Sequence, residues 1–234
     1  MTDLITVMWK EVVELFSNRR FLLIFTIVVL VMGILPTLHH GPASNSSAMM
    51  MFRLLYVLFA TVIVVGQTAP DMVLHERVGH TLDYLLTTRL PGYAIFGAKV
   101  LISFAVGYIA ALLALAIQLI VSGITGGSGW HWLFLAFPLG RVVAFGTTAT
   151  LSLYVAVIGT FVALRVGEQR AAYLITIFSV ALFIIPFLVG WLHFSLTTTW
   201  VTKFTIALGI IAFVLSRIGL RLFRREMLVL YLQE

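Results

Sequence analysis

Residues 100–122 read VLISFAVGYIAALLALAIQLIVS, a run without a single charged side chain. Its most polar residue is Gln118. A helix of about 20 apolar residues crosses a hydrocarbon core about 30 Å thick. The run therefore predicts a transmembrane helix.

The rest of the chain has the same character. It is 61% hydrophobic and 10% charged, whereas an ordinary soluble domain is about half apolar and about a quarter charged. Similar apolar runs occur at 21–38, 51–69, 139–164, 171–192 and 203–223. We therefore expect an all-α polytopic membrane protein with about six transmembrane helices, forming one transmembrane domain over residues 1–234.

The positive charges predict the orientation, because cytoplasmic loops carry Lys and Arg in excess. With the N-terminus inside, all but three of the 15 Lys and Arg fall on the cytoplasmic side; the exceptions are Arg53, Arg141 and Lys203. We expect a multi-pass protein of a prokaryotic inner (cell) membrane with both termini cytoplasmic. The net charge of +6 does not gather on one soluble face, so nucleic acid is not an expected partner.

Residues 1–20 precede the first apolar run and predict an amphipathic helix that lies in the membrane interface. Apolar residues recur there at helical spacing, namely Leu4, Met8, Val12, Leu15 and Phe16. A helix that only anchors the N-terminus is the alternative.

The longest polar connection runs over residues 70–99, between the second and third predicted spans. Thr81 is a suitable N-cap for a short helix. One face of that helix is apolar and consists of Leu82, Leu85 and Leu86. The residues alone predict this helix on the cytoplasmic side but not what it binds.

Histidines in the same connection suggest a zinc protease, since His75-Glu76 followed by His80 is similar to His-Glu-x-x-His. The second His, however, comes five residues after the first instead of four. At about 100° per residue, that spacing turns the two ligands about 140° apart on a helix. We therefore expect no metal site.

A longer pattern surrounds the predicted short helix. It consists of Glu76, Arg77, Thr81, Leu82, Asp83, Leu85, Leu86, Thr88, Gly97 and Lys99. It resembles a pattern in the permease subunits of ABC-2-type ABC transporters, which after their second span commonly show Glu-Arg or Glu-Lys, then Gly-Thr-Leu-Glu-x-Leu-Leu-x-Thr-Pro, then Gly-Lys. The sequence departs from the pattern at His80 (Gly in the family), Arg89 (Pro) and Ala98, which separates Gly97 from Lys99.

Weaker matches to the same family flank this stretch. Lys10-Glu11 and Arg19-Arg20 precede the first span, and the basic residues of 223–226 follow the last one.

The resemblance implies a half-transporter that pairs with a second permease, expected to be a second copy of this chain, and with two cytoplasmic ABC ATPase subunits. Residues 81–89 would then be the coupling helix. The ATPase-coupling residues are expected to be Glu76, Arg77, Thr81, Leu82, Asp83, Leu85, Leu86 and Arg89. The chain carries no Gly-x4-Gly-Lys-Ser/Thr phosphate loop, so we expect ATP and Mg on the partner and no enzymatic activity here.

Polar residues inside the bilayer are candidates for a substrate path. Gln118 and Arg141 are the clearest, although Gln118 also suits a hydrogen bond between helices. A span that starts at Val142 would instead leave Arg141 at the outer headgroups.

Small residues four apart, at Gly107 and Ala111 and at Gly159 and Ala163, predict close helix approach. Packing within the chain is the commoner explanation, and a dimer seam is the alternative.

The function that we expect is the permease subunit of an ATP-driven exporter of amphipathic or hydrophobic molecules, since the outer loops are short. The alternative is a secondary transporter, or an accessory subunit, without an ATPase. Secondary transporters usually place ionisable residues at mid-bilayer, and mid-span acids are absent from the sequence. This contrast favours the exporter.

The topology makes a direct prediction. Single cysteines at Asn45, Gly127 and Thr198 should react with an impermeant thiol reagent in intact cells, because these positions are expected outside. A cysteine at Gly79 should be protected. Labelling at Gly79 without labelling at Asn45 would refute the orientation.

Overall fold

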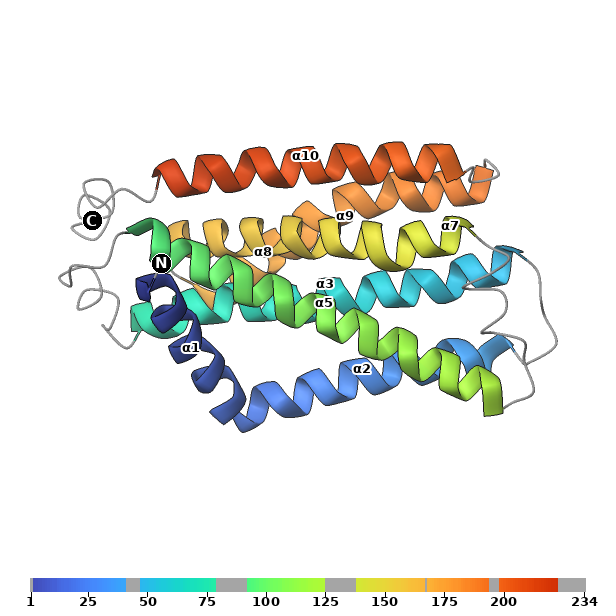
Figure 1. Cartoon of the computed structure of the whole chain (residues 1–234), viewed down its shortest axis with the longest axis horizontal. Helices are drawn as coiled ribbons and strands as arrows, with labels where there is room; N and C mark the ends of the chain where they lie inside the picture. The colour runs from blue at the N-terminus through green and yellow to red at the C-terminus, as the bar shows by residue number, and fades with distance from the viewer. Residues whose placement is uncertain are drawn as a thin grey trace.

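The computed structural model describes residues 2–40, 47–78, 92–124, 138–166, 168–193 and 198–222. The elements in chain order are α1 (Thr2–Ser17), α2 (Arg19–His40), α3 (Ser47–Val78), α5 (Gly92–Ile124), α7 (Pro138–Arg141), the π-helix η2 (Val142–Thr147), α8 (Thr148–Arg165), α9 (Gln169–His193) and α10 (Thr198–Leu222). The long helices run back and forth along one axis, and α1 lies across them at one end (Figure 1).

We call this the α1 end of the bundle. There α3 ends, α5 begins and α10 ends (Figure 1), and α5 packs against both of the other helices.

Within the described residues, five helical segments are long and apolar enough to cross a membrane. They are Arg19–Leu38, Phe52–Glu76, Ala94–Ile124, Val142–Arg165 and Thr199–Leu220. The all-helical class with several candidate spans is thus confirmed. The predicted span at 171–192 falls on α9, whose described apolar stretch, Arg170–Ala181, is shorter, so a count of six stays a prediction.

The helices extend beyond the predicted spans on both sides of the polar connection. α3 continues to Val78 and α5 begins at Gly92, so the ends of the predicted loop 70–99 are helical. Both extensions carry polar residues that find partners at the α1 end, as described below.

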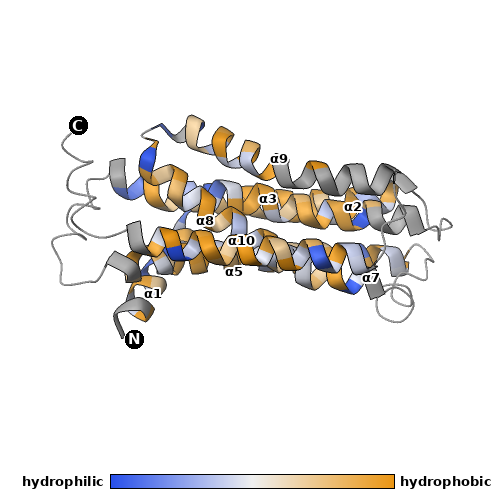
Figure 2. Ribbon diagram, turned by 90° about the horizontal axis from the view of Figure 1, so that it is seen from above, coloured by the Kyte–Doolittle hydropathy of each residue, from blue (hydrophilic) through white to orange (hydrophobic). Residues whose placement is uncertain are grey.

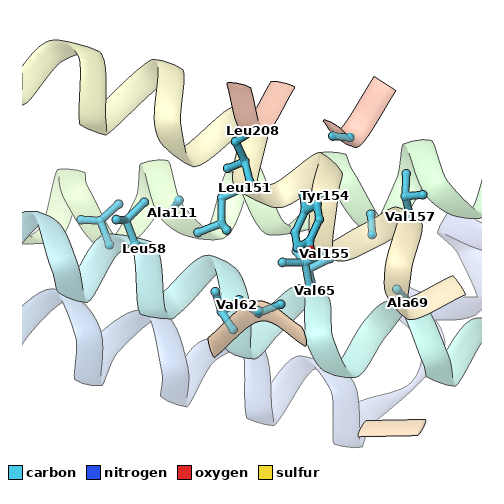
Figure 3. Packing of buried hydrophobic residues seen from close by; sticks show 14 of the residues in the cluster. Leu58, Val62, Val65, Ala69, Ala111, Leu151, Tyr154, Val155, Val157 and Leu208 are labelled. Carbon is cyan, nitrogen blue, oxygen red and sulfur yellow. The ribbon is translucent and has the colours of Figure 1, made fainter. Parts of the chain in front are cut away.

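α3 is central. It packs most extensively against α8 and α5, and buried side chains of the three helices and of α10 form the main core. Figure 3 shows Val65 of α3 and Val155 of α8 near the middle of this core, with Leu208 of α10 on the far side of α8. Hydrophobic residues predominate along the helices, and hydrophilic ones lie mainly toward the two ends (Figure 2).

Several polar side chains inside the bundle bond across helices. The Ser152 hydroxyl of α8 donates to the Phe104 carbonyl of α5 at 2.8 Å. The hydroxyls of Thr147 and Thr205 are 2.7 Å apart and join η2 to α10. Such bonds satisfy polar groups in an apolar surrounding, where an unpaired group is costly.

The helix α1 covers residues predicted to form the N-terminal amphipathic helix, but its packing differs from the prediction. Met8, Val12 and Leu15 of the predicted apolar face pack against α3 and α5, whereas Phe16 is exposed. The predicted face therefore contacts mainly the bundle.

Close approach within the chain is confirmed at two of the small residues. A Cβ at Gly107 would lie 1.8 Å from Cγ2 of Val65 and 2.9 Å from Oγ of Ser152. A Cβ at Gly159 would lie 2.9 Å from that of Ala69. These glycines let α5 and α8 approach α3.

We predict that Gly107→Ala destabilises the protein, because the added methyl overlaps Val65. Overpacking of this kind typically costs about 1–3 kcal/mol, and thermal unfolding in detergent measures it. Gly66→Ala is the matched control, since a Cβ at Gly66 meets only Cγ1 of Ile177, at 4.0 Å. Equal unfolding midpoints for the two variants would contradict the packing.

Candidate functional site: a buried charge cluster

A lysine is buried at the α1 end of the bundle. Lys99 lies in the second turn of α5 and is 2% exposed, like Glu76 of α3, while Glu11 of α1 is 3% exposed. The Lys99 Nζ lies 2.8 Å from Oε1 of Glu11 and 2.8 Å from Oε2 of Glu76. One ammonium thus joins three helices.

The ammonium of Lys99 also has a third partner. It donates to the backbone carbonyl of Met72, one turn before Glu76, at 2.9 Å. An ammonium has three N–H donors, and three acceptors surround this one. Buried charges persist when they are paired and hydrogen-bonded in this way.

Lys10 completes the group. Its Nζ donates to Oε1 of Glu76 at 3.0 Å, so each oxygen of that carboxylate faces one ammonium. We call Lys10, Glu11, Glu76 and Lys99 the charge cluster. Two positive and two negative charges balance there.

The apolar packing of α1 brings its two members of the cluster into place. Leu15 of α1 is buried with Met72 and Ile102, and Met8 and Val12 pack against them. Glu11 lies on the same face of α1, at helical spacing from Met8 and Leu15. The hydrophobic contacts therefore carry its carboxylate inward to Lys99.

Weaker charge contacts surround the cluster. The Glu14 carboxylate lies 3.9 Å from Nζ of Lys10 and 3.6 Å from Nε2 of His75. All three side chains are substantially exposed, and solvent-exposed pairs contribute little. The buried ion pairs of Lys99 with Glu11 and Glu76 are therefore the contacts that hold these helices together.

Burial raises the pKa of the Glu11 carboxyl above its ordinary 4.5 and outweighs the opposing effect of Lys99. The docked α1 therefore holds this proton more tightly than a free α1 would. The resulting contribution to docking is fully present below pH 4.5 and is lost as the pH rises through the raised pKa.

Burial lowers the pKa of Lys10, but its hydrogen bond to Glu76 and the nearby carboxylates outweigh burial, so the pKa lies above its ordinary 10.5. Lys10 therefore stays charged at neutral pH.

Of the predicted coupling residues, Glu76 is the one whose side chain lies in the described part of the chain. Glu76 lies inside the charge cluster, with its carboxylate turned to lysines of the same chain. Arg77 is in α3, and its side chain is outside the description. The remaining ones lie outside the described residues, namely Thr81, Leu82, Asp83, Leu85, Leu86 and Arg89.

The two predicted path residues lie elsewhere. Gln118 is buried, and its Nε2 donates to the carbonyls of Met32 at 3.0 Å and Arg53 at 3.3 Å, which ties α5 to α2 and α3. These bonds favour the interhelical role over substrate contact. Arg141 is exposed and directly precedes the candidate span Val142–Arg165, which favours its placement at a headgroup region.

Sequence reasoning missed that Lys10, Glu11 and Lys99 form one site with Glu76. In the sequence, Lys10-Glu11 and Lys99 belong to separate motifs. The available signal was that opposite charges in otherwise apolar helical patterns occur at the same predicted end of different helices.

Comparison with known proteins adds no assignment. No protein-family model matches the chain, and no curated protein matches its sequence.

We predict that Lys99→Met loosens α1 from the bundle, because it removes the ammonium that lies 2.8 Å from each of the two buried carboxylates, Glu11 and Glu76. Removing one partner of a buried pair costs about 3–5 kcal/mol. The expected result is a lower unfolding midpoint in detergent and faster thiol labelling of a cysteine placed at Met8, on the docked face.

The double variant Lys99→Met/Glu11→Leu is the matched test. It keeps the Lys10–Glu76 pair and removes one positive and one negative charge, so the charge cluster has no net charge. Because no buried Glu11 carboxylate is left without Lys99, the double variant should lose less stability than Lys99→Met alone. Exposed Lys203→Met is the control for loss of a lysine. If the single and double variants are equally stable, the cluster does not hold α1 as argued.

Proposed function

We propose that this chain is the permease subunit of an ATP-driven exporter of the ABC-2 type. In this proposal it spans a prokaryotic inner membrane six times, with α9 as the fifth span and both termini in the cytoplasm. It pairs with a second permease, a copy of itself, and with two ATPase subunits that bind ATP and Mg.

The charge cluster is the observation that carries the proposal. Three separate fragments resemble the family, at residues 10–11, 76–77 and 97–99, and the cluster brings one residue of each to within 3.0 Å of another. Nothing in the sequence match required these fragments to meet. Because the three fragments meet in the structure, we treat them as parts of one functional unit.

The position of the charge cluster suggests the role of this unit. Glu76 and Lys99 lie on the two helices that flank residues 79–91, the segment that holds the proposed coupling helix. The cluster fastens both helices to α1, which continues into α2 after a single residue. A partner that pushes on residues 81–89 would therefore move α1, α3 and α5 together.

The packing of the bundle bears on the route of the cargo. Side chains fill the space between α3, α5 and α8, including fully buried Val65 and Val155. We therefore place the route between two copies of the chain. The exposed apolar sides of α2 and α10 are available for lipid or for the second copy.

The location of the buried carboxylates distinguishes this proposal from a secondary transporter. The described ones, Glu11 and Glu76, lie at the α1 end and are paired with lysines. Proton- or sodium-coupled carriers typically place such groups near mid-bilayer.

We predict that the chain, tagged and purified from its own membranes, brings with it a second protein with a phosphate loop and has ATPase activity only in that complex. Leu85→Asp/Leu86→Asp should abolish both the association and the activity while membrane insertion stays normal. Burial of each Leu contributes about 1.5–3 kcal/mol, which a charged side chain forfeits.

The matched control is Tyr84→Asp/Thr87→Asp, which places two acids on the opposite face of the same predicted helix. This variant should keep its ATPase. Robust ATP hydrolysis by the isolated chain would refute the proposal. Unchanged association of the Leu85→Asp/Leu86→Asp variant would show that 81–89 is not the coupling element.

A further inference from the structure

The side chains of α1 divide into three sectors around the helix axis, at about 100° per residue. The docked sector faces the bundle and consists of Val7, Met8, Glu11, Val12 and Leu15. The polar sector consists of Thr6, Lys10, Glu14 and Ser17. The third is apolar and consists of Ile5, Trp9, Val13 and Phe16.

The third sector, called here the outer apolar sector, is exposed. Ile5 is 64% exposed, Trp9 71%, Val13 51% and Phe16 59%. Measured around the axis of α1, the centre of this sector lies about 100° from the centre of the polar sector and about 125° from that of the docked sector. An interfacial helix against a protein has three surroundings to satisfy, namely protein, hydrocarbon and water, and α1 has one sector for each.

The direction of the outer apolar sector is fixed at two points. The bond of Glu11 to Lys99 holds the docked sector inward. At the other end, Asn18 alone separates α1 from α2, and its side chain accepts a hydrogen bond from the backbone N–H of Arg20 at 3.1 Å. Asn is a preferred N-cap residue, so the corner between the two helices is defined.

Continuity with α2 indicates which surrounding covers this sector. α2 is a candidate span whose exposed side is apolar, with Leu23, Ile24 and Ile27 in its first turns. Along the chain, the outer apolar sector comes directly before this exposed apolar side, separated from it by the corner at Asn18. Trp is also, like Tyr, enriched at membrane–water interfaces.

Charge at the corner indicates the lipid class. Arg19 and Arg20 are both exposed directly after Asn18, where the chain enters the candidate span. Basic residues beside a membrane segment attract anionic headgroups.

We propose that the outer apolar sector of α1 inserts into the leaflet at the α1 end of the bundle, and that Arg19 and Arg20 bind the headgroups of anionic phospholipids there. Met8, Val12 and Leu15 of the docked sector, which the sequence alone placed on the membrane face, contact the protein instead. This inference requires only a membrane-spanning bundle and is independent of the transporter proposal.

The test uses the full chain with Trp9 as its only tryptophan, the other four replaced by Phe, in nanodiscs of phosphatidylcholine and phosphatidylglycerol. Trp9 fluorescence should be quenched by brominated lipid, with a shallow depth of about 5–10 Å below the headgroups. Aqueous acrylamide should quench it poorly. The matched control is Trp9→Phe/Thr6→Trp, which moves the indole to the polar sector and should reverse both results.

Replacement of both arginines, Arg19→Gln/Arg20→Gln, tests the headgroup contact. Bromination of phosphatidylglycerol should quench Trp9 more than bromination of phosphatidylcholine at equal mole fraction, and the variant should lose this preference. A basic residue near an anionic surface contributes roughly a fivefold preference. A preference that persists in the variant would overturn the role of the arginines.

Two results would overturn the insertion itself. If acrylamide quenches Trp9 as well as the Thr6→Trp indole, the sector faces water. If neither acrylamide nor brominated lipid reaches Trp9, protein covers it, from a second copy or from another chain.

Discussion

The ammonium of Lys99 stays buried only while acceptors surround it, and this requirement fixes the α1 end of the molecule. Its acceptors come from α1 and α3, while the lysine itself comes from α5. Each of these elements must therefore reach one point. Buried ion pairs often add little net stability compared with apolar residues, but a missing partner is costly, so the cluster specifies position more than it adds free energy.

Uncharged polar side chains in the rest of the bundle also need hydrogen-bond partners. Helices satisfy the backbone inside an apolar medium, and polar side chains must then find partners on neighbouring helices. Gln118 bonds to carbonyls of α2 and α3, and Ser152 bonds to a carbonyl of α5. Where no side chain is present, as at Gly107, the helices approach more closely. Together these contacts set the arrangement of α2, α5 and α8 around α3.

Fixing α1 has consequences in two directions. Within the chain, the charge cluster links α1 to α3 and α5, the helices that flank residues 79–91. A movement of one of these three helices therefore involves the other two. Toward the membrane, it sets which side of α1 faces away from the bundle. In the proposed transporter, the interfacial helix would thus move with the helices next to the ATPase site and within the leaflet at the same time.

The sequence by itself determined the class, because apolar runs of sufficient length have one stable solution in a bilayer. It also located the five candidate spans of the described residues to within several residues, although it began the fourth at 139 and gave Val142, where the candidate span starts, as the alternative. It did not determine how far α3 and α5 extend, because polar residues such as Glu76 and Lys99 read as loop until their partners are known. Only the tertiary structure decided that these two meet Glu11, and which apolar sector of α1 is docked. The physical reason is that helical periodicity defines faces within one helix, whereas the partner of each face depends on contacts between segments far apart in the chain.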